Sequence, residues 1–136
     1  MDARWLIDVL RDSDVEGLDA LVRDDVRFRS PYTDYEGRAV VTHVLRLVGQ
    51  VLEDVQPDNP GPSGSEVSPR SPTSRTTRFT AAVQGAPVQG VLCEDLDASG
   101  ELTEAVLFVR PYRELRTSLR LMRELLDRSP LPEPEE

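Results

Sequence analysis

One carboxylate stands out because the residues that share its strand face are apolar. Glu94 has the same strand parity as Val88, Leu92 and Leu96, so an extended chain places it on an apolar face. A carboxylate removed from water has a raised pKa, which makes it a better proton acceptor near neutral pH. Glu94 is therefore the first candidate for a general base. The alternative is a β-bulge that turns its side chain outward.

The single histidine, His43, is the second candidate for acid–base chemistry, since an unperturbed imidazole changes charge near neutral pH. It lies at the edge of a helical apolar stripe centred on Val44 and Val48, which also fits a partly exposed polar residue. The single cysteine, Cys93, has no basic residue near it in sequence and is interpreted as a small buried or interface residue. One cysteine and one histidine exclude an internal disulfide and a four-ligand Cys/His zinc site, and no metal site is expected.

The strand that follows Glu94 carries two further charged candidates. Glu104 and Arg110 have the same parity as Leu102, Val106 and Phe108. Arg110 could bind an anionic or carbonyl group through both arms of its guanidinium. It could equally pair with a carboxylate of the body and anchor the start of the last helix.

Three aromatic residues could line the mouth of a cavity, where an aromatic ring with a polar group both packs and orients a ligand. They are Trp5, Phe28 and Tyr32. Core packing is the alternative for Trp5 and Phe28. Tyr32 lies in the turn between a strand and a helix, and both interpretations stay open for it.

The composition limits the classes of function. The 136 residues fit one domain, and 16 basic against 25 acidic residues give a net charge of −9. Such an acidic chain is not expected to bind nucleic acid, because phosphates repel an acidic surface. No apolar run approaches the ~18 residues that cross a bilayer, and the N-terminal segment lacks a secretory signal. We therefore expect a cytoplasmic protein without membrane contact.

Hydrophobic periodicity predicts four helices and four strands. The helices are expected over 3–12, from Ser13 to Asp25, over 38–52 and from Pro111 to Arg128; the strands are expected over 26–30, 76–84, 88–97 and 101–110. Helices that precede an antiparallel meander predict an α+β domain with the helices packed on one face of the sheet.

Two segments have compositions typical of irregular chain. Residues 57–75 are rich in Pro, Ser and Gly, which predicts a mobile loop inserted into a single domain spanning 1–128. Residues 129–136 contain Pro and Glu and predict a disordered acidic tail.

An ordered set of segments resembles the SnoaL-like branch of the nuclear transport factor 2-like (cystatin-like α+β) superfamily. The segments are Leu21–Pro31, where a helix leads into a strand; Tyr35-Glu36-Gly37-Arg38, which opens the long helix; and Gln89–Val91, Leu96–Leu102 and Val109–Pro111, which form the closing meander. The resemblance implies a cone-shaped fold, with a curved antiparallel sheet wrapped around the N-terminal helices and one long helix, plus a C-terminal helix. It also implies an apolar cavity open at one end and a homodimer formed through the outer face of the sheet.

The same resemblance implies a small hydrophobic ligand and no cofactor, since the superfamily includes polyketide cyclases, ketosteroid isomerases and epoxide hydrolases. The expected chemistry is proton abstraction next to a carbonyl, as in a cyclase or isomerase, with Glu94 as the base and His43 second. The candidates for ligand contacts are Trp5, Tyr32, Glu104 and Arg110.

Two departures from the pattern of the enzymes leave a second function open. Leu92 stands where many SnoaL-like chains have an acidic residue after the Gly-Val pair, and no Asp-Arg-Asp set of the epoxide hydrolase kind can be matched. The alternative is a non-catalytic binding or protein-interaction module of the same fold. A cavity filled by Trp5, Leu92 and Phe108 would favour that module.

Overall fold

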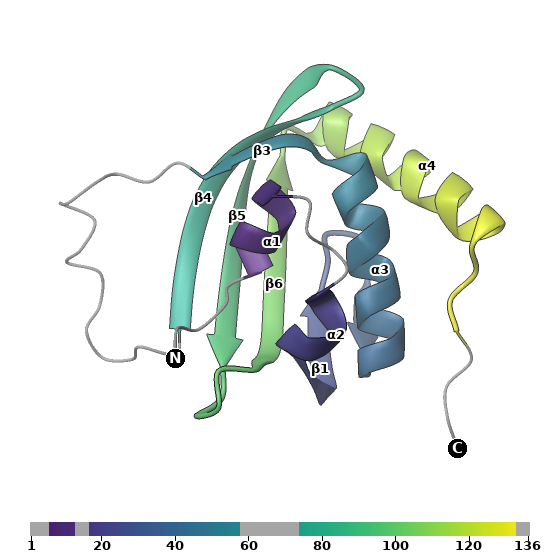
Figure 1. Ribbon diagram of the computed structural model, residues 1–136. Coiled ribbons are helices and arrows are strands. Elements are labelled where there is room, and N and C mark those ends of the chain that lie inside the picture. The colour runs from purple at the N-terminus through teal and green to yellow at the C-terminus, as the bar shows by residue number, and fades with distance from the viewer. Residues whose placement is uncertain (1–5, 13–16, 58–73, 133–136) are drawn as a thin grey trace, which may run out of the picture.

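The computed structural model describes residues 6–12, 17–57 and 74–132, which form both helices and strands (Figure 1). In chain order they are α1 (Leu6–Asp12), α2 (Leu18–Leu21), β1 (Val22–Arg29), β2 (Asp34–Glu36), α3 (Arg38–Val51), β3 (Glu53–Pro57), β4 (Ser74–Val83), β5 (Ala86–Leu96), β6 (Leu102–Arg110) and α4 (Tyr112–Arg128). Trp5 and most of the segment 57–75 lie outside the described residues. Of the described helices, none has the length and apolarity needed to cross a bilayer.

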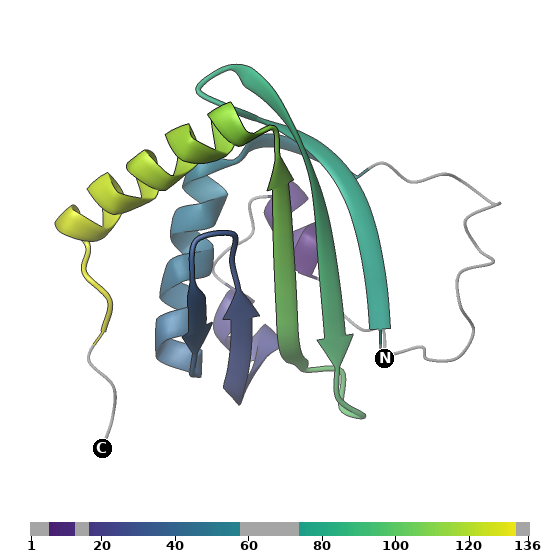
Figure 2. The same ribbon diagram turned by 180° about the vertical axis from the view of Figure 1, so that it is seen from behind.

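The six strands form one curved sheet in the order β2-β1-β6-β5-β4-β3. The pairs are antiparallel except for β1 and β6, which run parallel. The helices α1, α2 and α3 lie on the concave side, and α4 extends away from the end of β6 (Figure 1). Figure 2 shows the outer face of the sheet without a covering helix in the described part of the chain. The predicted α+β fold with a curved sheet wrapped around helices is confirmed.

Two short strands were not predicted, and both lie at the edges of the sheet. β2 occupies part of the turn-rich segment after β1, and β3 directly follows α3. β2 has no buried residue, and Val55 is the only buried residue of β3. Strands this short, with so little burial, lack the apolar alternation that identifies a strand in a sequence. They form because the neighbouring strand supplies their backbone hydrogen bonds.

The core fills the space between the concave face and the three helices. The apolar stripe predicted for the long helix is buried as expected, including Val41, Val44, Leu45 and Val48. The prediction for the last helix was less accurate. Of its expected stripe only Met122 is buried, and Leu115, Leu119 and Leu126 are half-buried. The cause is position, because α4 runs from the end of β6 away from the sheet and only part of its surface meets the body (Figure 2).

One glycine marks the curved part of the sheet. Gly90 on β5 stands opposite Phe79 on β4, and both face the concave side. A Cβ atom at Gly90 would meet the Phe79 ring at 2.3 Å. The aromatic ring therefore occupies the place of the missing side chain, an arrangement that lets strands bend while the core stays filled.

We predict that Gly90→Ala lowers the free energy of unfolding by about 1–3 kcal/mol, the usual cost of overpacking a core. The obstacle is the Phe79 ring, so Phe79→Leu combined with Gly90→Ala should cost less than the sum of the two single changes. Urea denaturation of the two single variants and the double variant measures this coupling. Purely additive effects would show that the ring is not what excludes a side chain at position 90.

Candidate functional site

The structure places Glu94 on the concave side of β5, where its side chain is only 1% exposed. The register between β5 and β6 is regular from Gln89 to Asp95, and the irregularity comes only after Asp95. No bulge therefore turns Glu94 outward. The carboxyl group lies among apolar side chains beneath α1, with Leu92 and Leu96 on the same strand face.

The two carboxylate oxygens of Glu94 have different surroundings. Oε2 accepts a hydrogen bond from the backbone N–H of Leu6, the first residue of α1. The first N–H groups of a helix have no partner within the helix, so this carboxylate caps α1 and fastens it to the sheet. Oε1 is fully buried and has no hydrogen-bond partner among the described residues. One oxygen thus holds α1, and the other is buried without using its capacity to accept a hydrogen bond from the described residues.

Burial raises the pKa of Glu94 from 4.5 to about 7, because the charged form loses its hydration. The backbone N–H groups of Leu6 and Ile7 oppose this rise, as does the charge of Arg75, whereas Asp8 adds to it. Asp8 lies 3.8 Å from Arg75. Near neutral pH the carboxyl group can therefore both take up and release a proton, which suits a general acid–base.

A residue that the sequence analysis missed lies beside Glu94. Thr77 on β4 faces the same concave side, and its Oγ1 is buried without a hydrogen-bond partner among the described residues. The strand parity that Thr77 shares with Phe79 and Ala81 was the available signal, since it places a hydroxyl on an apolar face.

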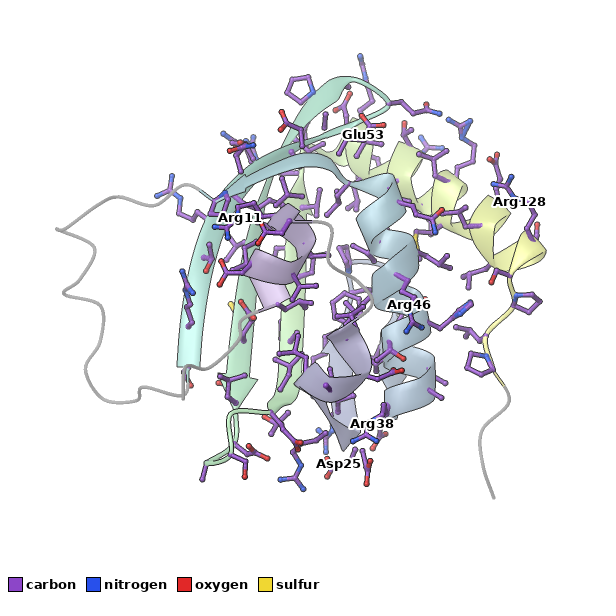
Figure 3. The ribbon with its side chains drawn as sticks, viewed as in Figure 1. Arg11, Asp25, Arg38, Arg46, Glu53 and Arg128 are labelled. Carbon is purple, nitrogen blue, oxygen red and sulfur yellow. The ribbon has the colours of Figure 1, made fainter. Side chains whose placement is uncertain are left out.

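His43 lies in a different part of the molecule. Its Nε2 is 2.7 Å from the backbone oxygen of Ser129 and 3.3 Å from the Ser129 hydroxyl, so the side chain holds the segment after α4 against α3. The cleft at this position has a volume of about 1050 Å³. Figure 3 labels Arg38 and Arg46, two of the residues that line it. The structure does not bring His43 and Glu94 together.

Glu104 and Arg110 lie on the outer face of the sheet, opposite to the face of Glu94. Glu104 pairs with Arg29 at 2.7 Å, and the Nη1 of Arg110 donates to Gln89 at 2.6 Å. Phe108 has the same orientation and is 57% exposed, so it does not fill the interior. The sequence predicts that Leu102 shares a face with Glu104 and Phe108, yet Leu102 is buried. The reason is a shift in the β5–β6 register between Asp95 and Leu96, after which the alternation of faces starts anew.

Tyr32 connects the turn between β1 and β2 to the last helix. Its hydroxyl is 2.8 Å from Ser118 Oγ on α4, and burial raises its pKa. Tyr32 packs against the core as a half-buried residue. Trp5 lies outside the described residues, and its expected ligand contact stays a prediction. Within the described part of the chain, no group of three or more His, Cys, Asp or Glu side chains could hold a metal ion.

The raised pKa of Glu94 predicts a pH-dependent stability. An acid whose pKa is higher in the folded state than in the unfolded chain stabilises the fold at low pH, and this stability is lost as the pH rises from about 4.5 to about 7. Glu94→Gln stays neutral, so the stability of the wild type relative to this variant should fall by on the order of 3 kcal/mol across that window. Urea denaturation at several pH values measures the difference. Glu104→Gln on the exposed outer face is the control, and a difference that is constant with pH would contradict the assignment.

Comparisons with known proteins support the fold strongly. No protein-family model matches the chain, and no curated protein matches it. A cystatin-like protein from Silicibacter pomeroyi has a TM-score of 0.78 at 23% identity, over 91% of this chain and 84% of that one. A steroid delta-isomerase from Pseudomonas aeruginosa has a TM-score of 0.77 at 25% identity, over 89% and 85% of the two chains. A SnoaL-like protein of unknown function from Burkholderia thailandensis has a TM-score of 0.58 at 12% identity, over 78% and 89%.

These matches extend over most of both chains in each comparison. The order of elements described above and the extent of the matches leave the architecture in no doubt. The chain therefore has the cystatin-like, nuclear transport factor 2-like fold.

Proposed function

We propose that the protein binds a small, mostly apolar carbonyl compound on the concave side of the sheet and that Glu94 moves a proton next to the carbonyl. This is the chemistry of a cofactor-independent isomerase or cyclase of the SnoaL-like kind. The observation that carries the proposal is the carboxylate itself, which is buried, has a pKa of about 7 and has no hydrogen-bond partner for Oε1 in the described part of the chain.

The reaction needs only one group that takes and returns a proton. Oε1 of Glu94 accepts the proton of a carbon next to the carbonyl, and the electron pair of the broken C–H bond moves toward the carbonyl oxygen. The same oxygen then returns the proton to another carbon of the conjugated system, which gives an isomer with no net gain or loss of atoms. When α1 covers the site, Oε2 is bound to the Leu6 N–H, which orients the carboxylate.

Access to Glu94 requires α1 to move, because the carboxyl group lies beneath this helix. α1 has seven residues, and its apolar side chains Leu6, Ile7, Val9 and Leu10 are buried against the body. A helix this short has little stability of its own, so its position depends on this packing and on the Glu94 hydrogen bond. The similar fold of the steroid delta-isomerase from Pseudomonas aeruginosa supports a bulky apolar carbonyl compound as the class of substrate.

We predict that Glu94→Gln lowers the turnover of a β,γ-unsaturated cyclohexenone to its conjugated isomer by roughly 10²–10⁴-fold, the usual contribution of a positioned general base. The absorbance of the conjugated enone measures the rate. Glu94→Asp keeps the carboxylate and should retain more activity than Glu94→Gln. Glu104→Gln is the matched control on the outer face, and equal turnover by Glu94→Gln and the wild type would refute the proposal.

The alternative function is a non-catalytic binding or interaction module, and one observation favours it. The hydrogen bond from Leu6 to Glu94 closes the carboxylate under α1, which is also what a purely structural helix cap would do. The two functions differ in ligand binding. A module predicts that Glu94→Gln changes stability alone, whereas the proposed enzyme predicts loss of both turnover and affinity for a ketone.

The outer face of the sheet supports a homodimer as part of the proposal. Phe108 is exposed there and stands opposite Val91, next to a depression of about 290 Å³ over Gly90. Arg78 and Arg110 border the depression. An apolar surface with a polar rim is typical of an interface between proteins.

We predict that Phe108→Glu converts the protein to a monomer, because two glutamates would face each other at the centre of a symmetric interface. Sedimentation at micromolar concentration measures the change. Leu131→Glu makes the same substitution on an exposed residue after α4 and should leave the dimer intact. A wild-type protein that sediments as a monomer would overturn this part of the proposal.

A further inference from the structure

We propose that Thr77 binds the carbonyl oxygen of the substrate, so that Thr77 and Glu94 form a two-point polar subsite beneath α1. The inference rests on the proposed function and specifies the class of substrate. That class is a neutral ketone or its enol, held at the oxygen by Thr77 and at the neighbouring carbon by Glu94.

The sheet register places the two side chains side by side. Thr77 on β4 pairs with Leu92 on β5, and Arg75 pairs with Glu94. Thr77 and Glu94 are therefore diagonal neighbours on adjacent strands. The Cα atoms of such neighbours lie about 7–8 Å apart. Both point to the concave side, where Thr77 is 7% and Glu94 1% exposed. Once α1 has moved, a small molecule between them would touch both groups at once.

Each side chain also has one buried oxygen without a hydrogen-bond partner among the described residues. Two other buried hydroxyls show the normal situation: Thr42 Oγ1 donates to the Arg38 oxygen at 2.7 Å, and Ser118 Oγ donates to the Leu115 oxygen at 2.6 Å. Thr77 Oγ1 and Glu94 Oε1 are instead unpartnered within the described part of the chain. An unsatisfied buried polar atom costs stability, so two of them on neighbouring strands indicate a place where a ligand supplies the missing hydrogen bonds.

The chemistry of the two atoms selects the ligand. The Thr77 hydroxyl donates a hydrogen bond to a carbonyl oxygen, on which negative charge develops as Glu94 removes the proton from the adjacent carbon. The oxygen and that carbon are two bonds apart in every ketone, which suits two protein groups on adjacent strands. A carboxylate ligand does not fit, because its charge would meet the Glu94 carboxylate in a buried, mostly apolar site.

The test compares Thr77→Val with Thr42→Val, since each change removes one buried hydroxyl and keeps the shape of the side chain. In the ligand-free protein, Thr42→Val breaks a hydrogen bond and should lower the melting temperature. Thr77→Val removes an atom without a partner and should leave the melting temperature unchanged or raise it. A loss of stability in Thr77→Val equal to that in Thr42→Val would mean that a buried water alone satisfies Thr77, which overturns the inference.

Ligand binding gives a second readout that does not depend on turnover. Wild-type protein should bind cyclohexanone more tightly than methylenecyclohexane, which lacks the oxygen. Thr77→Val should reduce this preference by roughly three- to tenfold, the value of one neutral hydrogen bond. Thr77→Ser keeps the hydroxyl and should restore the preference. A wild-type protein that binds the two compounds equally would refute the subsite.

Kinetics separate this inference from the proposed function. Thr77→Val should lower kcat for the β,γ-unsaturated cyclohexenone more than it changes KM, because the hydrogen bond strengthens as charge develops. If Glu94→Gln stops turnover and Thr77→Val leaves kcat and ketone preference intact, the Thr77 inference fails and the proposed function stands. If Glu94→Gln has no effect on turnover, the proposed function itself fails.

Discussion

The hydrogen bond between the Glu94 carboxylate and the first turn of α1 is the interaction on which the interior depends. It brings a charged group into an apolar region and uses one oxygen to hold a helix that is too short to be stable alone. Burial raises the pKa of the carboxyl group, and the hydrogen bond fixes the helix over the concave face. The same bond therefore determines how the interior is closed and how readily its carboxyl group exchanges a proton.

The two faces of the sheet carry different kinds of side chain. The concave face carries Glu94 and Thr77, whose side chains are buried in the core. The outer face carries charged pairs such as Glu104 with Arg29, together with the exposed Phe108. Strand alternation makes this division possible, because adjacent residues of β5 and β6 belong to opposite environments. A ligand and a second protein chain could therefore bind to the same strands without competing.

The candidate site could be predicted only in part from the sequence. Glu94 was identified by parity, because the apolar residues two positions away on either side require an extended strand with one buried face. The ligand roles expected for Glu104 and Arg110 depended on the direction of their strand face, which the irregular register after Asp95 decides. His43 was chosen for its chemistry, yet its ring binds Ser129, in the segment after α4.

The sequence by itself determined the α+β class, the long apolar helix and the three strands of the meander, since each depends on periodicity within one segment. Only the tertiary structure decided that Leu6 donates to Glu94, that Thr77 lies beside it and that β2 and β3 exist as strands. These features need partners far away in the chain. A hydrogen bond across 88 residues, or the absence of one at a buried oxygen, leaves no local pattern in the sequence.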